Sequence, residues 1–430
     1  MKRDKINELS VWKNSPYRKP LILTGARQVG KTWLLKAFGA EHYKQVVYVN
    51  FEDQVALKKI FLTDFNISRI IKVLEIFSGI KINAPDTLII FDEIQTAENG
   101  ITSLKYFHEN APEYHLIAAG SMLGIAHHKG SSFPVGKVDF LNLTPMTFLE
   151  FLTANNEEQL AEAILNSDWA LIQIFHTKLL DLLKIYMYVG GMPEVVKIYL
   201  ESDDFQLVRK TQINLLNAYQ NDFAKYAPLE IVPRLNMVWQ SIPAQLAKEN
   251  KKFVYNILKE GARAKNFEIA IQWLTDCGLL LKTNRIKTPK MPLTAYEEWT
   301  VFKLFLVDVG LLGALSQLSS HAIIEGNQIF EEFKGALAEQ FIRQQLSAED
   351  IFIGYWTNEN SSAEVDFLVQ KGNRIIALEV KSGENVRSKS FSEFNKKYQL
   401  QAIRFSALPF QKQDWMENRP LYAVGSLFRD

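Results

Sequence analysis

The feature that most constrains the fold is a glycine-rich segment near the start of the chain. Residues 21–32 read Leu-Ile-Leu-Thr-Gly-Ala-Arg-Gln-Val-Gly-Lys-Thr and match the pattern G-x-x-x-x-G-K-[ST]. Gly25, Gly30, Lys31 and Thr32 occupy its fixed positions. The apolar triplet before the motif predicts a buried strand, and the residues after it predict the start of a helix. A strand, a glycine-rich loop and a helix in this order indicate a phosphate-binding loop in an α/β fold.

The chemistry of each position explains the motif. Backbone N–H groups of such a loop, together with the first turn of the helix, can surround the β-phosphate of a nucleotide. Lys31 would then reach the β- and γ-phosphates, and the Thr32 hydroxyl would coordinate Mg²⁺. A chance glycine turn between a strand and a helix is the alternative. The residues predicted to contact ATP are Gly25, Arg27, Gln28, Val29, Gly30, Lys31, Thr32 and Trp33.

An acidic segment supplies the expected partner of this loop. Residues 87–93 read Thr-Leu-Ile-Ile-Phe-Asp-Glu, which predicts a buried strand that carries two carboxylates to the carboxyl end of the sheet. We expect Asp92 to hold Mg²⁺ through its water shell, and Glu93 to position and deprotonate the attacking water. An acidic loop after a core strand is the alternative. A further strand leads to Ser121, which we expect to contact the γ-phosphate or the water, although its position fits a helix cap equally well.

Composition limits the class of protein. The chain has 430 residues, enough for two or three domains, and its 47% hydrophobic and 23% charged content is ordinary for a soluble globular protein. The single cysteine, Cys277, excludes an internal disulfide and fits a reducing compartment. The charged N-terminus has no signal-peptide core after it, and no apolar run approaches the ~20 residues of a spanning helix. We therefore expect a cytoplasmic protein that does not enter a membrane.

The middle of the chain, residues 151–330, predicts a helical region. Within it, residues 233–310 carry the pattern of a winged helix, which is three helices followed by a pair of strands. The predicted helices are residues 234–248, 253–260 and 265–277, and the predicted strands are residues 279–288 and 299–308.

Charge gives this predicted winged helix a candidate role. Between Lys248 and Lys290, ten Lys or Arg residues stand against four Asp or Glu residues, so the local net charge is +6 in a chain whose total is +1. A basic winged helix can contact a nucleic-acid backbone without reading its sequence. The alternative is that the module serves as a lid or a protein contact. The total charge of +1 predicts no nucleic-acid surface over the whole chain.

The last hundred residues, 331–430, predict a third domain with its own candidate site. Glu379 and Lys381 lie two apart on a predicted strand, so their side chains share a face, and Asp366 can face them from the neighbouring strand. Two carboxylates beside a lysine can bind Mg²⁺ and generate hydroxide for phosphodiester cleavage. Glu339, on a helix predicted at residues 331–345, would add a further carboxylate. A solvated hairpin with a salt bridge is the alternative.

Motifs spread along the chain resemble those of a known family. They are residues 25–32, Asp-Glu-Ile-Gln at 92–95, Ala-Gly-Ser at 119–121, Leu-Thr-Pro-Met-Thr-Phe-Leu-Glu-Phe at 143–151 and Gly-Gly-Met-Pro-Glu at 190–194. Together they resemble a large family of bacterial and archaeal AAA-type ATPases, whose C-terminal domain of unknown function has a core similar to restriction-endonuclease-like, PD-(D/E)XK folds. The resemblance implies an α/β protein with a P-loop ATPase domain at residues 1–150, a helical and winged-helix middle at 151–330 and a nuclease-like domain at 331–430.

One position departs from this family. Its members usually carry Gly-Arg before the Leu-x-Pro segment, whereas this chain carries Gly136-Lys137. Lysine keeps the charge but lacks the planar guanidinium fork, so a weaker or differently regulated hydrolysis step would follow if that residue senses phosphate. The sequence identifies no arginine finger, and it leaves the oligomeric state open.

We therefore expect an ATPase that hydrolyses ATP with Mg²⁺ and acts on DNA through its winged helix and nuclease-like domain. The alternative is a nucleotide-dependent switch that binds a protein partner and carries an inactive nuclease-like domain.

Overall fold

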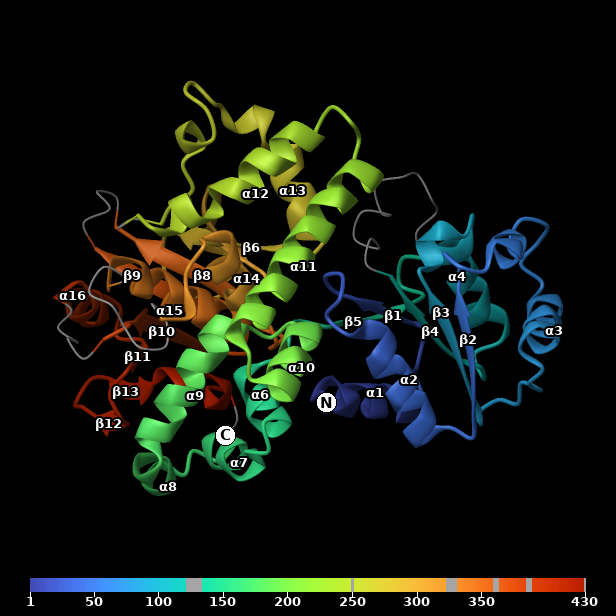
Figure 1. The fold of residues 1–430 in the computed structure, drawn as a ribbon, viewed down its shortest axis with the longest axis horizontal. Helices are drawn as coiled ribbons and strands as arrows, with labels where there is room; N and C mark the ends of the chain where they lie inside the picture. The colour runs from blue at the N-terminus through green and yellow to red at the C-terminus, as the bar shows by residue number, and fades with distance from the viewer. Residues whose placement is uncertain (121–133, 249–250, 322–330, 359–362, 384–388, 429–430) are drawn as a thin grey trace. The chain divides into compact units, whose positions relative to one another are not determined.

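The computed structural model describes residues 1–120, 134–248, 251–321, 331–358, 363–383 and 389–428 (Figure 1). The chain divides into two compact units. The first comprises Arg3–Thr144 with Asp276–Gly278, and we call it the P-loop unit. The second comprises Met1–Lys2, Pro145–Thr275 and Leu279–Asp430, and we call it the C-terminal unit. A separate third domain from residue 331 stays a prediction.

The P-loop unit is built on a five-stranded sheet whose strands are all parallel, in the order β2-β3-β4-β1-β5. β4 therefore lies between the strand before the glycine-rich loop and the strand that ends in Asp92 and Glu93. The predicted α/β fold with a parallel sheet is confirmed here. The strands are β1 (Leu21–Thr24), β2 (Gln45–Asn50), β3 (Thr87–Asp92), β4 (His115–Ala119) and β5 (Asp139–Asn142).

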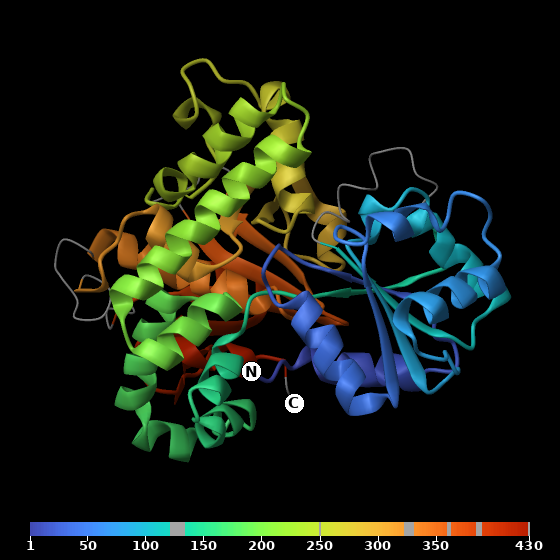
Figure 2. The ribbon, with the colours of Figure 1, turned by 45° about the vertical axis from the view of Figure 1, so that its right-hand side comes forward.

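Helices cover both faces of this sheet, as Figures 1 and 2 show. Every residue of β3 is buried, which is expected for a central strand with helices on each side. Side chains that alternate along β2 and β3, such as Val49 and Phe91, join α3 and α4 in one hydrophobic core. The helices of the unit are α1 (Lys5–Asn14), α2 (Lys31–His42), α3 (Ile67–Ser78) and α4 (Gly100–Asn110).

The C-terminal unit contains a mixed sheet of eight strands in the order β12-β13-β11-β10-β9-β8-β6-β7. β8, β9 and β10 are antiparallel neighbours, whereas β11 runs parallel to β10. The two neighbouring strands predicted to carry Asp366 and Glu379 are confirmed. The strands are β6 (Leu280–Ile286), β7 (Glu297–Leu306), β8 (Phe352–Thr357), β9 (Glu364–Lys371), β10 (Arg374–Val380), β11 (Gln401–Ser406), β12 (Gln411–Lys412) and β13 (Glu417–Pro420).

Helices form the rest of the C-terminal unit, which confirms the helical pattern expected from residue 151. They are α6 (Phe148–Ala154), α7 (Glu158–Leu165), α8 (Trp169–Ile174), α9 (His176–Val189), α10 (Pro193–Ser202), α11 (Phe205–Tyr226), α12 (Val232–Leu246), α13 (Glu268–Asp276), α14 (Val309–Leu315), α15 (Glu331–Leu346) and α16 (Lys389–Tyr398). Among the described residues, no helix is both long and apolar enough to cross a lipid bilayer.

The Gly-Gly-Met-Pro-Glu segment has an architectural explanation. A Cβ on Gly191 would lie 2.1 Å from the Met146 carbonyl oxygen, and that close approach leaves room only for glycine. The Met146 N–H donates to the Gly191 carbonyl at 2.7 Å, and the Gly191 N–H donates to the buried Asp308 carboxylate at 2.6 Å. The segment therefore joins α9 and α10 to α14.

The predicted winged helix is only partly recovered. β6 and β7 form the expected antiparallel pair, but β6 also pairs with β8, so the pair is the edge of the eight-stranded sheet. The helix predicted at residues 253–260 is wrong, because only Tyr255–Ile257 form a 3₁₀ turn. The Phe253 N–H donates to the Phe302 carbonyl at 2.8 Å, and the two rings stack at 5.5 Å. This attachment to β7 overrides local helical propensity.

Candidate functional site

The glycine-rich loop connects β1 to α2 in a conformation that its two glycines permit. Gly25 has φ +134°, and a Cβ there would lie 2.2 Å from the carbonyl oxygen of Leu143. Gly30, with φ +93°, precedes the first residue of α2. The first helical bond of α2 is from the Leu34 N–H to the Gly30 carbonyl, so the three N–H groups before Leu34 come ahead of the helical hydrogen-bond series. The loop and helix start are therefore suited to bind an anion.

Lys31 is buried at the start of α2, and its ammonium points into the loop. Its Nζ donates to the carbonyl oxygens of Gly25 and Ala26, each at 2.8 Å. Burial lowers the pKa of Lys31 to about 8, although the carboxylates of Glu93 and Asp92 oppose that shift. The ammonium is thus held by neutral acceptors, and a phosphate would supply the compensating charge that these carbonyls lack.

Thr32 and Asp92 meet at the carboxyl end of the sheet. The Thr32 hydroxyl donates to Asp92 Oδ2 at 2.6 Å, and the Glu93 N–H donates to Asp92 Oδ1 at 3.1 Å. A hydroxyl and a carboxylate at this separation form an oxygen donor set of the kind that Mg²⁺ prefers. Thr32 and Asp92 would hold a Mg²⁺ ion, which would supply positive charge beside a bound nucleotide.

Glu93 adopts φ +50°, a conformation that is uncommon outside glycine and that turns the chain directly after β3. Gln95 Nε2 donates to Glu93 Oε2 at 2.5 Å. In the described part of the chain, the buried Gln95 Oε1 has no hydrogen-bond partner. An ordered water is the usual partner for such an acceptor. The carboxylate that we predict to activate water is therefore fixed by a side chain that can itself accept from a water.

The other predicted nucleotide contacts differ in exposure. Val29 is buried and Arg27 is half-buried, whereas Gln28 is exposed and has φ +67°. Trp33, in the first turn of α2, leaves 50% of its surface exposed. Ser121, the predicted γ-phosphate contact, lies outside the described residues. Its assignment stays a prediction.

Two residues of this site were not found from the sequence. Tyr48 lies on β2, beside β3, and its hydroxyl donates to Asp92 Oδ2 at 2.9 Å. Arg3 is buried, and its guanidinium donates to the carbonyls of Val29 at 2.8 Å and Thr144 at 2.6 Å. The hydroxyl of Tyr48 lies within the apolar strand β2, and this polar group in the sequence could have identified Tyr48 as a site residue. Nothing in the spacing of Arg3 indicates a contact 26 residues away.

Lys137 replaces the arginine that the resembling family usually carries. Its Nζ lies 3.0 Å from Oε1 of Glu109 on α4, so its charge is paired within the P-loop unit.

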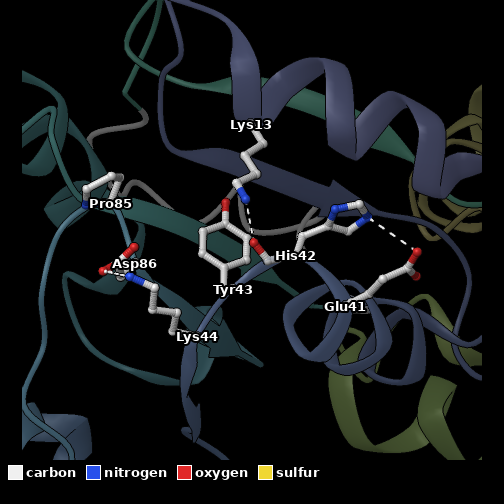
Figure 3. Close-up of a pocket in the computed structure, with 7 residues that line it drawn as sticks. All are labelled: Lys13, Glu41, His42, Tyr43, Lys44, Pro85 and Asp86. Carbon is white, nitrogen blue, oxygen red and sulfur yellow. Dashed lines mark hydrogen bonds and ion pairs between the residues drawn. The ribbon is translucent and has the colours of Figure 1, made fainter.

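A pocket of about 410 Å³ lies at the other end of the same sheet (Figure 3). Lys44 and Asp86, which precede β2 and β3, form an ion pair at 2.8 Å in its wall. The Lys13 ammonium lies 4.3 Å from the centre of the Tyr43 ring. Lys44 is paired with Asp86, and Lys13 donates to the backbone carbonyl of His42. The pocket is remote from Lys31 and Asp92. We assign it no role in nucleotide binding.

The second predicted site, in the C-terminal unit, has a different character. Lys303 on β7 is fully buried, and its Nζ is ion-paired with Glu364 on β9 and lies 3.5 Å from Glu339 on α15. Lys251 forms a further ion pair with Glu339. Burial alone would lower the pKa of Lys303, but Glu339, Glu364 and Asp366 raise it above its usual range. The carboxylates of Glu339 and Glu364 are therefore neutralised by lysines.

Glu379, on β10, lies next to the guanidinium of Arg404 on the neighbouring strand β11. Its carboxylate accepts from Arg404 Nε at 3.0 Å and lies 3.4 Å from Lys381 Nζ, so the structure brings Glu379 and Lys381 together. Asp366 accepts instead from the Val380 N–H at 2.8 Å. Burial, and after it the charge of Glu339, raises the pKa of Asp366 to about 7.

The predicted Mg²⁺ site of this unit does not fit the structure. Within the described ranges, no three His, Cys, Asp or Glu side chains are placed to share a metal ion. The carboxylates of Glu339 and Glu379 already accept from Lys251 and Arg404. We therefore derive no reaction step through a metal ion at Asp366 and Glu379.

Comparison with protein families matches three parts of the chain. Residues 17–152 match an AAA domain family, residues 180–322 match the domain of unknown function DUF8612, and residues 334–416 match the domain of unknown function DUF4143. The chain thus carries an AAA-type P-loop ATPase domain with an ATP-binding fold, as predicted. The likeness of the C-terminal region to restriction endonucleases stays a prediction.

Solved structures show more distant likenesses. The Walker-type ATPase PABY2304 of Pyrococcus abyssi is 15% identical, with 73% of this chain and 95% of that chain covered and a TM-score of 0.46. The Orc1 protein of Aeropyrum pernix in complex with DNA is 14% identical, covers 74% and 93%, and has a TM-score of 0.29. The RuvB Holliday junction branch migration motor of Thermotoga maritima is 13% identical, covers 67% and 90%, and has a TM-score of 0.31. No functional conclusion rests on likenesses of this size. A search of curated proteins finds no match.

Proposed function

We propose that this chain, which carries an AAA-type P-loop domain, binds ATP with Mg²⁺ and hydrolyses it. One observation carries the proposal. Lys31, Thr32 and Asp92 converge at the carboxyl end of the parallel sheet, with Thr32 Oγ1 2.6 Å from Asp92 Oδ2 and Lys31 turned into the loop. This is the arrangement that phosphoryl transfer needs, because the protein contributes positioning and charge rather than covalent chemistry.

Each residue of the site has a distinct part in this proposal. Lys31 would exchange its two carbonyl partners for phosphate oxygens and stabilise the charge that develops on them. Asp92 and Thr32 would hold Mg²⁺, which supplies charge neutralisation between the phosphates when it is bound. Glu93, fixed by Gln95, would orient and deprotonate a water. Tyr48 would hold the Asp92 carboxylate toward Thr32.

The test is phosphate release from ATP by the full chain in the presence of Mg²⁺. We expect turnover that the Lys31→Ala variant abolishes, because the ammonium is the charge that the loop aims at the phosphates. Lys72→Ala, which removes an exposed lysine from α3, is the matched control and should leave turnover unchanged. Equal turnover in Lys31→Ala and the wild type would refute the assignment.

We also propose that the basic segment before α13 contacts nucleic acid. Lys259, Arg263 and Lys265 are all exposed within seven residues of sequence, which supports this role. Two other cations counted in the sequence are ion-paired within the chain, Arg285 with Glu298 on β7 and Lys251 with Glu339. The contact surface is therefore narrower than the local charge of +6 suggested.

The alternative proposal is a nucleotide-dependent switch that binds a protein partner. The exposed apolar side chains of Leu229 and Ile269, 80% and 65% exposed, support a protein contact around α12 and α13. The two proposals separate on salt dependence. Nucleic-acid binding is supported if the affinity for a labelled DNA duplex falls steeply as the salt concentration rises. The slope of this salt dependence should then be smaller in the triple variant Lys259→Gln, Arg263→Gln, Lys265→Gln. No DNA binding at any salt concentration supports the switch.

A further inference from the structure

Lys303 is buried among acidic side chains that come from two other elements. Its side chain is 0% exposed. Glu364 and Asp366 come from β9, and Glu339 comes from α15. All three carboxylates act on the Lys303 ammonium, and Glu364 and Glu339 do so through ion pairs. Lys303 also lies 4.9 Å from the centre of the Tyr355 ring, which adds a favourable cation–π contact.

Charge in this region is balanced without a metal ion. We call the whole set the carboxylate–lysine cluster. It contains four carboxylates and four cationic side chains, and its ion pairs go to Glu339, Glu364 and Glu379. Divalent cations are bound by carboxylate oxygens that have free lone pairs. In this cluster ammonium and guanidinium groups contact the oxygens of Glu339, Glu364 and Glu379, and Asp366 accepts from the Val380 N–H. A divalent ion would have to displace a buried ammonium and leave it unpaired, which is strongly unfavourable. The members are Lys251, Lys303, Lys381 and Arg404 with Glu339, Glu364, Asp366 and Glu379.

We infer that the Lys303 ammonium is the resident cation of this cluster, in the place where the acidic residues would otherwise hold a divalent metal ion. The cluster then joins α15 to β7 and β9 and has no part in metal-dependent cleavage of a phosphodiester. This inference rests on and deepens the proposed switch, and its test is independent of ATP turnover.

The experiment follows thermal unfolding of the full chain with and without Mn²⁺. All variants carry Asp92→Asn, which removes the predicted metal carboxylate of the P-loop unit. Lys303→Met removes the resident cation and leaves Glu339, Glu364 and Asp366 without it. We expect its melting temperature to rise with Mn²⁺, because a ligand that binds the folded state stabilises it. The parent and Lys396→Met, a control on the exposed face of α16, should not respond.

Other outcomes are equally clear. If Lys303→Met does not fold in the absence of metal, the double variant Lys303→Met, Glu364→Gln, which keeps Glu339 and Asp366 and leaves one carboxylate fewer without its partner, takes its place with the same expectation. A variant that folds and does not respond to Mn²⁺ would overturn the inference. A melting temperature of the parent that rises with Mn²⁺, and no longer does so after Asp366→Asn or Glu379→Gln, would also overturn it. Neither result would bear on ATP hydrolysis, because no arm contains nucleotide.

Discussion

Two buried lysines in the described part of the chain, Lys31 and Lys303, have opposite surroundings. Lys31 donates to two backbone carbonyls, and burial lowers its pKa to about 8. Lys303 is equally enclosed, but acidic neighbours overcome the effect of burial and raise its pKa above the usual range. A buried ammonium held mainly by neutral oxygens attracts an anion, whereas one held by carboxylates is already compensated. The site of Lys31 is therefore suited to bind an anionic ligand, whereas the charge of Lys303 is already balanced by side chains of the chain itself.

The same contrast holds for the carboxylates. Asp92 accepts from two hydroxyl groups, Thr32 and Tyr48, which can give way to a metal ion or share it. Glu379 accepts from the guanidinium of Arg404, a charged partner rather than a hydroxyl. Similar residue types therefore predict different chemistry once their partners are known.

The largest expected effect concerns Glu93, in the P-loop unit. Glu93→Gln keeps the shape of the side chain and removes the base, so turnover should fall by about 10²–10⁴-fold, the usual contribution of general-base catalysis. Binding of ATP should persist, because Lys31 and Thr32 are unchanged. Phosphate release and equilibrium dialysis with ATP measure the two quantities. Glu98→Gln, a nearby exposed carboxylate, is the control. Loss of binding together with turnover would assign Glu93 a structural role.

The second prediction tests whether Lys303 balances the charge of the carboxylate–lysine cluster. Lys303→Met should lower the free energy of unfolding by about 3–5 kcal/mol, the usual cost of leaving a buried charge without its partner. Adding Glu364→Gln should recover part of the loss, since that variant removes one of the stranded carboxylates. Denaturant unfolding of the single and double variants measures the coupling. Additive losses would show that the two side chains do not interact.

The third prediction tests whether the charge of Lys31 lacks a compensating partner in the free protein. Because the pKa of Lys31 in the folded protein, about 8, is below its usual 10.5, the cost of burying the charge is present below pH 8 and disappears toward pH 10.5. The free protein therefore gains stability as pH rises through this window, whereas ATP affinity falls by up to about tenfold for each pH unit above the pKa. ATP dialysis at pH values on either side of the pKa measures this. Lys31→Ala should bind weakly and lack the pH dependence.

The smallest effect concerns Tyr48. Tyr48→Phe removes one hydrogen bond to Asp92, worth about 1 kcal/mol, so the Mg²⁺ concentration for half-maximal turnover should rise by about fivefold. The melting temperature should change little, because the ring stays in place. Tyr106→Phe, whose ring stacks on Phe65 at 4.2 Å, is the control. An unchanged Mg²⁺ requirement would show that Tyr48 does not position Asp92.

The fold of the P-loop unit could be predicted because its signals are local. An apolar run followed by a motif or by acidic residues predicts a buried parallel strand and the end at which its ligand site lies. The error at residues 253–260 has the opposite cause. Local spacing favoured a helix there, and the contacts of Phe253 with Phe302 on β7, almost fifty residues later, prevailed.

The candidate sites divide in the same way. Lys31, Thr32 and Asp92 could be placed together because the motif spacing and the parallel sheet determine where they lie. The partners of Asp366 and Glu379 could not be placed, since Lys303 and Arg404 belong to strands whose pairing the sequence does not specify. The two metal ligands predicted there accept from other partners in the structure, Asp366 from the Val380 N–H and Glu379 from Arg404.

One measurement tests both the nucleotide site and the carboxylate–lysine cluster. It is the number of Mn²⁺ ions that the full chain binds in the presence of ATP, counted by electron paramagnetic resonance. We expect one ion, which is lost in Asp92→Asn and retained in Glu379→Gln. A second ion that depends on Glu379 or Asp366 would contradict the claim that the C-terminal cluster is complete. The absence of any ion that depends on Asp92 would contradict the nucleotide site itself.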